Sequence, residues 1–178
     1  STPIKSSAAS DVYKRQMLER GREMVSFSYE HLVPIRHYVH QHPELSGQEY
    51  KTTAYLKAYL EKLGVRILNS GLKTGLIAEI GSGKPVIALR ADIDALPIQE
   101  NTGLDYQSQN PGVMHACGHD FHQVSLLGAA EVLKGMEADL KGTVRLIFQP
   151  AEETSEGASA VLATGLLEDV QALSLIHI

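Results

Sequence analysis

The sequence predicts an α/β fold, in which helices alternate with buried strands, and three observations support this. In several segments apolar residues recur every three or four positions, as they do along helices with one buried face. Short, nearly continuous apolar runs lie between these segments, and such runs are typical of strands buried on both faces. The 178 residues, of which 43% are hydrophobic and 21% charged, suffice for one domain with its own core.

Two helices are predicted first. Apolar residues at helical spacing indicate a helix over residues 30–38, which stops before Pro43. Ser46 and Glu49 lie three positions apart and predict a capping box, in which each side chain would bind a backbone N–H at the start of a helix. The apolar face that follows predicts that this second helix continues until Gly64 ends it.

Strands are predicted next along the chain. Short apolar runs place them at residues 65–68, 75–80 and 85–89. A Gly-Ser-Gly turn at residues 81–83 would join the last two strands as a hairpin. The run at residues 86–89 is expected to be buried on both faces.

The second half of the chain alternates in the same way after a polar loop. Its predicted elements are a helix over residues 119–133 that closes at Gly135, a strand over residues 143–148 and a small-residue helix over residues 155–163 that ends before Gly165. No internal repeat or low-complexity linker separates these elements. One α/β domain is therefore expected.

The two ends of the chain carry a pattern that points to DNA processing. Residues 11–16 can be encoded as GAT GTG TAT AAG AGA CAG, and the reverse complement of that DNA encodes Leu-Ser-Leu-Ile-His-Ile, which is residues 173–178. Such an inverted repeat resembles the transposon end that is used to tag DNA for sequencing. We therefore expect residues 1–16 and 173–178 to derive from sequencing adaptors, and residues 17–172 to be the insert between them.

Charge, apolar runs and cysteine content exclude several classes of protein. The formal net charge is -5 and the Lys and Arg residues are scattered, so a nucleic-acid partner is not expected. No apolar run approaches the roughly 18 residues of a membrane-spanning helix, so no membrane partner is expected either. A single Cys excludes a disulfide framework and, with the absence of a charged-then-apolar leader in the insert, favours a cytoplasmic location.

Potential metal ligands gather at the ends of apolar strands, where open α/β sheets place their sites. Asp92 and Asp94 follow a buried strand, although alone they could equally be solvated turn residues. Residues 115–122 hold three histidines and the only thiol, including Cys117 and His119. Sulfur beside imidazole is a zinc-like or manganese-tolerant donor set, so metal binding is favoured over the alternative, a catalytic Cys–His thiol pair.

A third cluster consists of Glu152 and Glu153, which close an apolar strand. Adjacent side chains diverge, so one carboxylate can bind a metal while the other stays free. A free carboxylate beside a metal-bound water is what general-base hydrolysis requires, because the metal lowers the pKa of the water toward roughly 7. Taken alone, the pair could also be the acidic start of a helix.

Four stretches, in this order, resemble the cocatalytic metallopeptidase-like aminoacylases. They match the amidohydrolase branch, which includes hippurate hydrolases, N-acetyl-diaminopimelate deacetylases and indole-acetyl-amino-acid hydrolases. The stretches are residues 36–46 (RHYVHQHPELS), 89–97 (LRADIDALP), 114–122 (MHACGHDFH) and 148–153 (FQPAEE). The resemblance implies a zinc-exopeptidase-like catalytic domain with a mixed central sheet flanked by helices, of which residues 17–172 would be the N-terminal part.

Residue roles follow from this resemblance position by position. Cys117 would be the thiolate that bridges two divalent metal ions, Mn²⁺ or Zn²⁺, with His119 as a ligand to one of them. Glu153 would be a further ligand and Glu152 the general base. Asp94 matches a carboxylate that supports the site.

Other residues of the signature receive no chemical role. Asp92 lies where sister branches have a ligand His, which makes it a doubtful ligand. His40, His42 and Glu44 belong to the first stretch, and packing or support of the ligands is expected of them.

The implied reaction is hydrolysis of the amide bond in small N-acyl amino acids, which yields a carboxylic acid and a free amino acid. Family members continue to a third His ligand, a lid and dimerisation domain and a last His. We expect this chain to be truncated before them, so that it is inactive or binds metal weakly, while the parent protein is a homodimer. The alternatives are a non-catalytic metal-binding or interaction domain of the same fold, and a dipeptidase.

Overall fold

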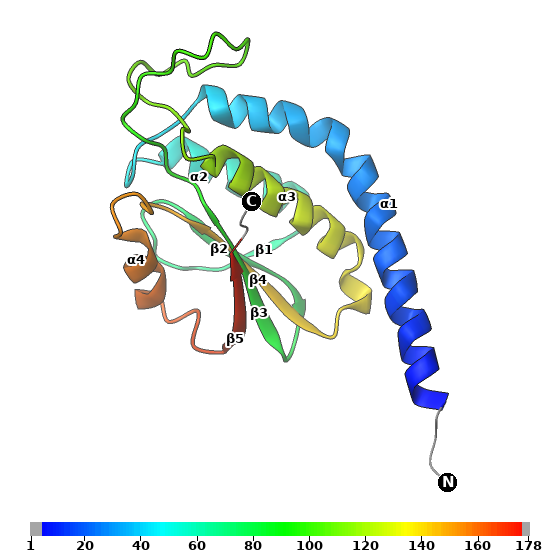
Figure 1. The fold of residues 1–178 in the computed structure, drawn as a ribbon. Coiled ribbons are helices and arrows are strands. Elements are labelled where there is room, and N and C mark those ends of the chain that lie inside the picture. Colours follow the sequence, from blue (N-terminus) through cyan, green and yellow to red (C-terminus); the bar gives the residue numbers. More distant parts are fainter. Residues whose placement is uncertain (1–4, 176–178) are drawn as a thin grey trace.

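The computed structural model describes the backbone of residues 5–175, and the side chains of that range apart from 5–14, 17, 24–29 and 175. Along the described chain the elements are α1 (Lys5–Gln41), α2 (Tyr50–Lys62), β1 (Arg66–Ile67), β2 (Leu76–Ser82), β3 (Val86–Asp92), α3 (His119–Gly135), the short 3₁₀ helix η1 (Glu137–Asp139), β4 (Gly142–Gln149), α4 (Gly157–Ala163) and β5 (Val170–Leu175). Helices therefore alternate with strands, and the predicted α/β class is confirmed (Figure 1).

The strands form one mixed sheet in the order β1-β2-β4-β3-β5. β2 runs antiparallel to β1 and β4, whereas β3 runs parallel to both β4 and β5. The predicted hairpin between β2 and β3 is wrong, because β4 lies between these two strands. β4 is buried along almost its whole length, so it takes the centre of the sheet and keeps β2 and β3 apart.

Helices cover both faces of the sheet. The larger core cluster lies between the sheet and helices α2 and α3, and includes Leu56, Leu127 and Phe148. α1 packs along the outside of α3 (Figure 1). The smaller cluster lies on the opposite face, where Val161 of α4 packs against Ile147 of β4.

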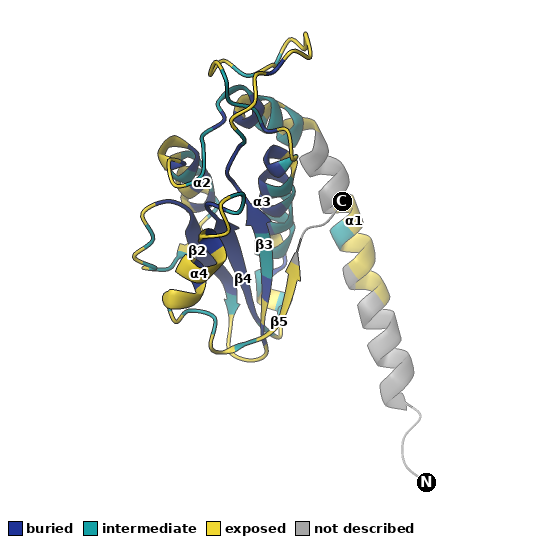
Figure 2. Ribbon diagram, turned by 60° about the vertical axis from the view of Figure 1, so that its left-hand side comes forward, coloured by how far each residue is buried: buried dark blue, intermediate teal, exposed yellow. Residues whose placement is uncertain are grey.

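Burial follows this layering, with buried residues concentrated in the central strands and the adjoining face of α3 (Figure 2). β3 departs from the expectation that residues 86–89 are buried on both faces, because Ile87 is 41% exposed. Ile87 shares a face with Leu89 but lies near the start of the strand. No helix within the described part of the chain is long and apolar enough to cross a membrane.

Two helices differ in extent from their predictions, and one strand was not predicted. α1 ends before Pro43 as expected but begins at Lys5, far upstream of residue 30. α4 begins at Gly157, two residues later than predicted, because Ser155 has a left-handed backbone (φ +60°) that a helix does not tolerate. β5 was not predicted, and it includes residues 173–175. The adaptor origin of the two ends stays a prediction, and residues 1–4 and 176–178 lie outside the described residues.

Candidate metal centre

The site lies where the parallel strands β3 and β4 end side by side. Asp92 pairs with Gln149 at the carboxyl end of both strands, and the N–H of Ile93 donates to the carbonyl oxygen of Gln149 over 3.0 Å. The acidic segments that follow the two strands therefore start next to each other, at the edge of the sheet where such folds place ligands. The start of α3 joins them, because Gly118 adopts a left-handed conformation (φ +88°) and turns the chain into the helix.

His119 lies at the centre of this convergence and is almost fully buried. Its Nδ1 donates to the backbone oxygen of Asp94 over 2.9 Å and lies 3.3 Å from the carboxylate oxygen Oδ1. Nδ1 therefore carries the proton, which leaves the lone pair of Nε2 available to a metal. Nε2 faces both acidic residues of the third cluster, at 3.8 Å from Glu152 Oε2 and 3.9 Å from Glu153 Oε1.

The structure brings together the three ligands that the sequence predicted. One potential ligand atom from each of Cys117, His119 and Glu153 lies within 4.8 Å of the other two. Glu153 Oε1 is buried and has no hydrogen-bond partner among the described residues, although its side chain as a whole is 22% exposed. A buried oxygen without a hydrogen-bond partner destabilises the folded state unless a cation or a water molecule binds to it. Thiolate, imidazole and carboxylate form a donor set that fits a divalent transition metal.

A second set of ligand atoms shares His119. Asp92, His119 and His122 also offer atoms within 4.8 Å of one another. Sequence reasoning noted His122 as part of its cluster but did not select it, because its position one turn into α3 reveals no partner in the sequence. Arg90 Nε donates to Asp92 Oδ1 over 3.0 Å, so this carboxylate already has a cationic partner. Asp92 is therefore the weaker candidate as a ligand.

The side chain of Cys117 is exposed and does not have the features of an activated nucleophile. Partial burial raises the pKa of its thiol, and the nearby carboxylates, Glu153 first among them, raise it further. Catalytic cysteines have lowered pKa values, so the thiol-pair alternative is disfavoured. A bound metal would itself deprotonate the thiol.

Glu152 is the more exposed of the two adjacent glutamates, with 40% of its side chain accessible. Burial raises the pKa of its carboxyl, and the negative charge of Asp92 raises it further. A carboxylate with a raised pKa accepts a proton more readily than an ordinary one. Glu152 thus keeps access to solvent, whereas Glu153 places a buried oxygen beside Cys117 and His119.

Asp94 supports the site without joining the ligand cluster. Its side chain is completely buried, and Oδ2 accepts hydrogen bonds from Ser46 Oγ (2.7 Å) and the backbone N–H of Glu153 (3.0 Å). Burial opposes ionisation, but the hydrogen bonds with His119, Ser46 and the Glu153 backbone outweigh it and lower the pKa of Asp94 to about 2. The carboxylate therefore contacts both His119 and the backbone of Glu153, two of the predicted ligands.

The predicted capping box is wrong, and its residues serve this site instead. α2 begins at Tyr50, which leaves Ser46 too far upstream to be its cap. Ser46 binds Asp94, and Glu49 Oε1 accepts the backbone N–H of Ala151 over 2.8 Å.

The first N–H groups of α2 are accepted by Glu44 instead. Its carboxylate binds those of Lys51 (3.2 Å) and Thr52 (2.8 Å). Glu44 precedes the helix by six residues, and its side chain caps the first turn from the N-terminal end. Glu44 therefore stabilises the start of α2 and is not among the residues of the ligand cluster.

His40 and His42 of the first signature stretch have hydrogen-bond partners outside the ligand cluster. His40 is buried, with Nδ1 2.7 Å from Asp120 Oδ2 and Nε2 3.1 Å from Glu100 Oε1. His42 donates through Nδ1 to the carbonyl oxygen of Tyr38 over 2.7 Å. His40 therefore ties α1 to the start of α3, which agrees with a supporting role.

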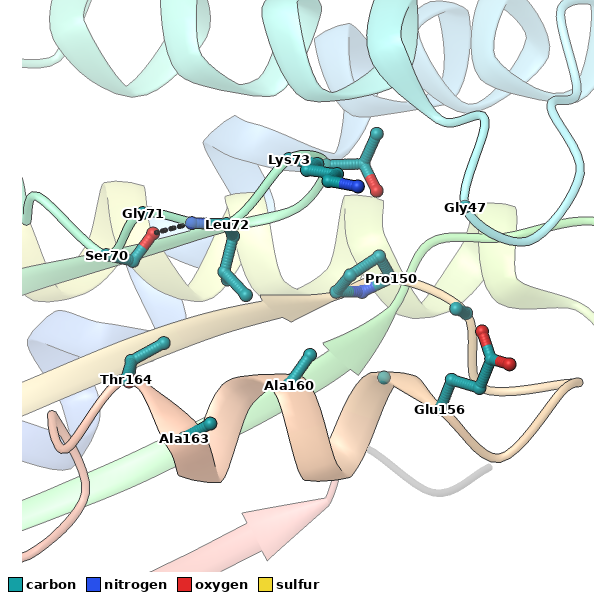
Figure 3. A pocket seen from close by; sticks show the side chains of 13 residues that line it. Gly47, Ser70, Gly71, Leu72, Lys73, Pro150, Glu156, Ala160, Ala163 and Thr164 are labelled. Carbon is teal, nitrogen blue, oxygen red and sulfur yellow. Dashed lines mark hydrogen bonds between the residues drawn. The ribbon is translucent and has the colours of Figure 1, made fainter.

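A pocket of about 450 Å³ opens beside the turn that carries the two glutamates. Figure 3 shows Pro150 on one side of it, with Leu72 of the loop before β2 and Ala160 of α4 facing the same space. Glu156 lies at the end nearest the turn. The space is large enough for a small organic group, but Glu152 and Glu153 are not among its lining residues.

Comparisons with known proteins identify the family of the chain. The model of peptidase family M20/M25/M40 matches residues 88–178. An N-acetyl-L-cysteine deacetylase of Bacillus subtilis is 53% identical over 148 residues, which are 82% of this chain and 36% of that protein. The IAA-amino acid hydrolase ILR1-like 5 of Arabidopsis thaliana is 46% identical over 84% of this chain and 35% of its own length.

A solved structure is similar as well. The Bacillus subtilis protein YXEP, described as a dinuclear metal-binding peptidase of family M20, superimposes with a TM-score of 0.81 and 50% identity, over 88% of this chain and 44% of that one. The chain thus spans less than half the length of these relatives.

Proposed function

The chain belongs to peptidase family M20/M25/M40, and from this premise we propose that the whole protein is a metal-dependent hydrolase of the amide bond in N-acyl amino acids. The single observation that carries the proposal is the meeting of Cys117, His119 and Glu153 within 4.8 Å, with Glu152 beside them. Relatives named as a deacetylase and an amino acid hydrolase support the same substrate class. A cytoplasmic location and a homodimer remain predictions.

The proposed centre holds two divalent ions, Mn²⁺ or Zn²⁺. Cys117, His119 and Glu153 would bind them, and the YXEP structure supports a pair of metals. Divalent metals at such a site lower the pKa of water and polarise the carbonyl of the substrate. The hydrogen bond from His119 Nδ1 to Asp94 fixes the ring so that Nε2 faces the centre.

Glu152 is the proposed general base. Its pKa is raised, so it accepts the proton of the attacking water readily and can return it to the nitrogen of the leaving amine. The amide carbon–nitrogen bond breaks as the carbon–oxygen bond forms, so the products are a carboxylic acid and an amino acid with a free amine.

The centre can be tested in this chain by titrating it with Mn²⁺ and measuring the paramagnetic broadening of its NMR amide signals. We expect broadening around residues 117, 119 and 153, and its loss in Cys117→Ser and Glu153→Gln. Glu152→Gln should bind Mn²⁺ like the wild type, because Glu152 acts on the proton and not on the metal. Equal weakening by Glu152→Gln and Glu153→Gln would contradict the separate roles.

The longer protein tests the reaction. There, Glu152→Gln should abolish hydrolysis of N-acetyl amino acids while metal binding persists. A panel of N-acyl amino acids and dipeptides then separates the proposed activity from a dipeptidase, since faster turnover of dipeptides would favour the latter. No turnover of either class would favour a non-catalytic metal-binding domain.

A further inference from the structure

We propose that Ser46 and Glu49 are positioning residues that fix the orientation of Glu152 and Glu153, an inference that rests on the proposed function. Both belong to the segment of residues 44–49, between α1 and α2. The segment lies between the two loops that carry the acidic residues of the site, and it binds each of them.

The first of these loops, after β3, is held along its backbone and at its carboxylate. The N–H of Ala95 donates to the carbonyl oxygen of Glu44 over 2.8 Å, and Leu45 forms a parallel bridge with Ala95. Ser46 Oγ then donates to Asp94 Oδ2 over 2.7 Å. The same oxygen of Asp94 accepts the backbone N–H of Glu153. Ser46 therefore fixes the position of the carboxylate that holds the backbone of Glu153, a proposed metal ligand.

The second loop, after β4, is held at Ala151. Glu49 is completely buried, and its Oε1 accepts the N–H of Ala151 over 2.8 Å. Ala151 has a left-handed backbone (φ +48°), which is uncommon for a residue with a side chain and costs on the order of 1 kcal/mol. The hydrogen bond from Ala151 to Glu49 therefore opposes relaxation of this backbone.

Close packing leaves this turn little freedom in other directions. A Cβ on Gly157 would lie 1.6 Å from the carbonyl oxygen of Pro150, and one on Gly75 would lie 2.6 Å from that of Phe148. Gly157 also donates its N–H to the carbonyl oxygen of Ala151 over 3.0 Å. Backbone contacts thus enclose the turn, and Glu49 adds a side-chain acceptor to its N–H side.

The backbone angles of Ala151 decide where the next two side chains point. If Ala151 relaxed toward an ordinary conformation, the N–H of Glu153 would move away from Asp94, and its carboxylate would leave Cys117 and His119. Loss of Glu49 should therefore weaken metal binding without removing any ligand. A merely structural role would instead lower stability and leave the affinity of the folded protein unchanged.

Three variants of this chain separate the two roles. Glu49→Leu removes the acceptor, Glu49→Gln retains a carbonyl oxygen in nearly the same shape, and Leu60→Ala is the matched control. Leu60 is completely buried on α2, the helix that Glu49 precedes, so its truncation destabilises the fold without touching the turn. The readouts are Mn²⁺ affinity from NMR broadening, hydrogen exchange of the Ala151 amide and the unfolding temperature.

We expect Glu49→Leu to weaken Mn²⁺ binding by about 10- to 100-fold and to speed the exchange of the Ala151 amide. Glu49→Gln should keep the Mn²⁺ affinity and the Ala151 exchange rate of the wild type. Leu60→Ala should lower the unfolding temperature and change neither the affinity nor the exchange rate. Ser46→Ala should weaken Mn²⁺ binding less, since Glu153 still donates to Asp94. Unchanged affinity and exchange in Glu49→Leu would overturn the proposal, as would equal weakening by Leu60→Ala.

Failure of the proposed function would look different. If the wild-type chain showed no broadening near residues 117, 119 and 153, the metal centre would be wrong. Exchange of the Ala151 amide would then decide alone, with faster exchange in Glu49→Leu supporting the positioning of the turn and unchanged exchange overturning it.

Discussion

Replacing Asp94 by Asn tests the arrangement around the ligand cluster most directly. The substitution preserves shape and removes the charge that accepts from Ser46 and the Glu153 backbone and lies beside His119. One carboxamide position becomes an N–H donor. On the Oδ1 side this donor would face the Nδ1–H of His119, and on the Oδ2 side it would face the backbone N–H of Glu153, although there the Ser46 hydroxyl can turn to accept it.

The magnitude follows from the pKa of Asp94. Hydrogen bonds lower it from 3.8 to about 2 against the opposing effect of burial, which corresponds to about 2 kcal/mol of stability near neutral pH. Because the folded pKa is depressed, this contribution is complete above the unfolded value and is lost as the pH falls through the folded value. We expect Asp94→Asn to cost about 2 kcal/mol near pH 7 and about half of that near pH 3.

Urea unfolding of the wild type and Asp94→Asn at several pH values measures this difference. Glu61→Gln is a suitable control, because Glu61 is exposed and its ion pair with Lys57 (3.8 Å) contributes less than about 0.5 kcal/mol. A cost of Asp94→Asn that stays constant between pH 7 and pH 3 would refute the view that the charge of Asp94 is what the hydrogen bonds stabilise.

Three further substitutions test the fold. Gly157→Ala should cost about 3 kcal/mol or more, because its Cβ would lie 1.6 Å from the carbonyl oxygen of Pro150; a smaller loss in urea unfolding would show that the turn can shift. A Cβ on Gly21 of α1 would meet no atom within 4 Å, so Gly21→Ala should stabilise the folded protein by about 0.5 kcal/mol. A lower unfolding temperature would contradict the placement of Gly21 in a helix. Arg145→Met should cost up to about 3 kcal/mol, since Arg145 Nη2 pairs with buried Glu79 over 2.9 Å and only Arg66 would then pair with that carboxylate. Adding Glu79→Met should recover part of that loss, and no recovery would mean that lost packing dominates.

Much of the candidate site could be predicted from the sequence because its residues are grouped along the chain. Cys117 and His119 are two positions apart and Glu152 and Glu153 are adjacent, so each pair appears as a local pattern. Each group also follows an apolar strand or begins a helix, and strand ends in α/β folds meet at one edge. The resemblance to a known family then assigned roles that spacing alone left open.

The tertiary structure alone decided the contacts that join these groups. Ser46 and Glu49 read as a local cap, yet they bind Asp94 and Ala151, which lie 48 and 102 positions further along the chain. The position of β4 between β2 and β3 could not be predicted from the sequence either. Periodicity and spacing report the local backbone and the side of an element that is buried. They do not report which buried surfaces meet, because that depends on how all the elements pack together.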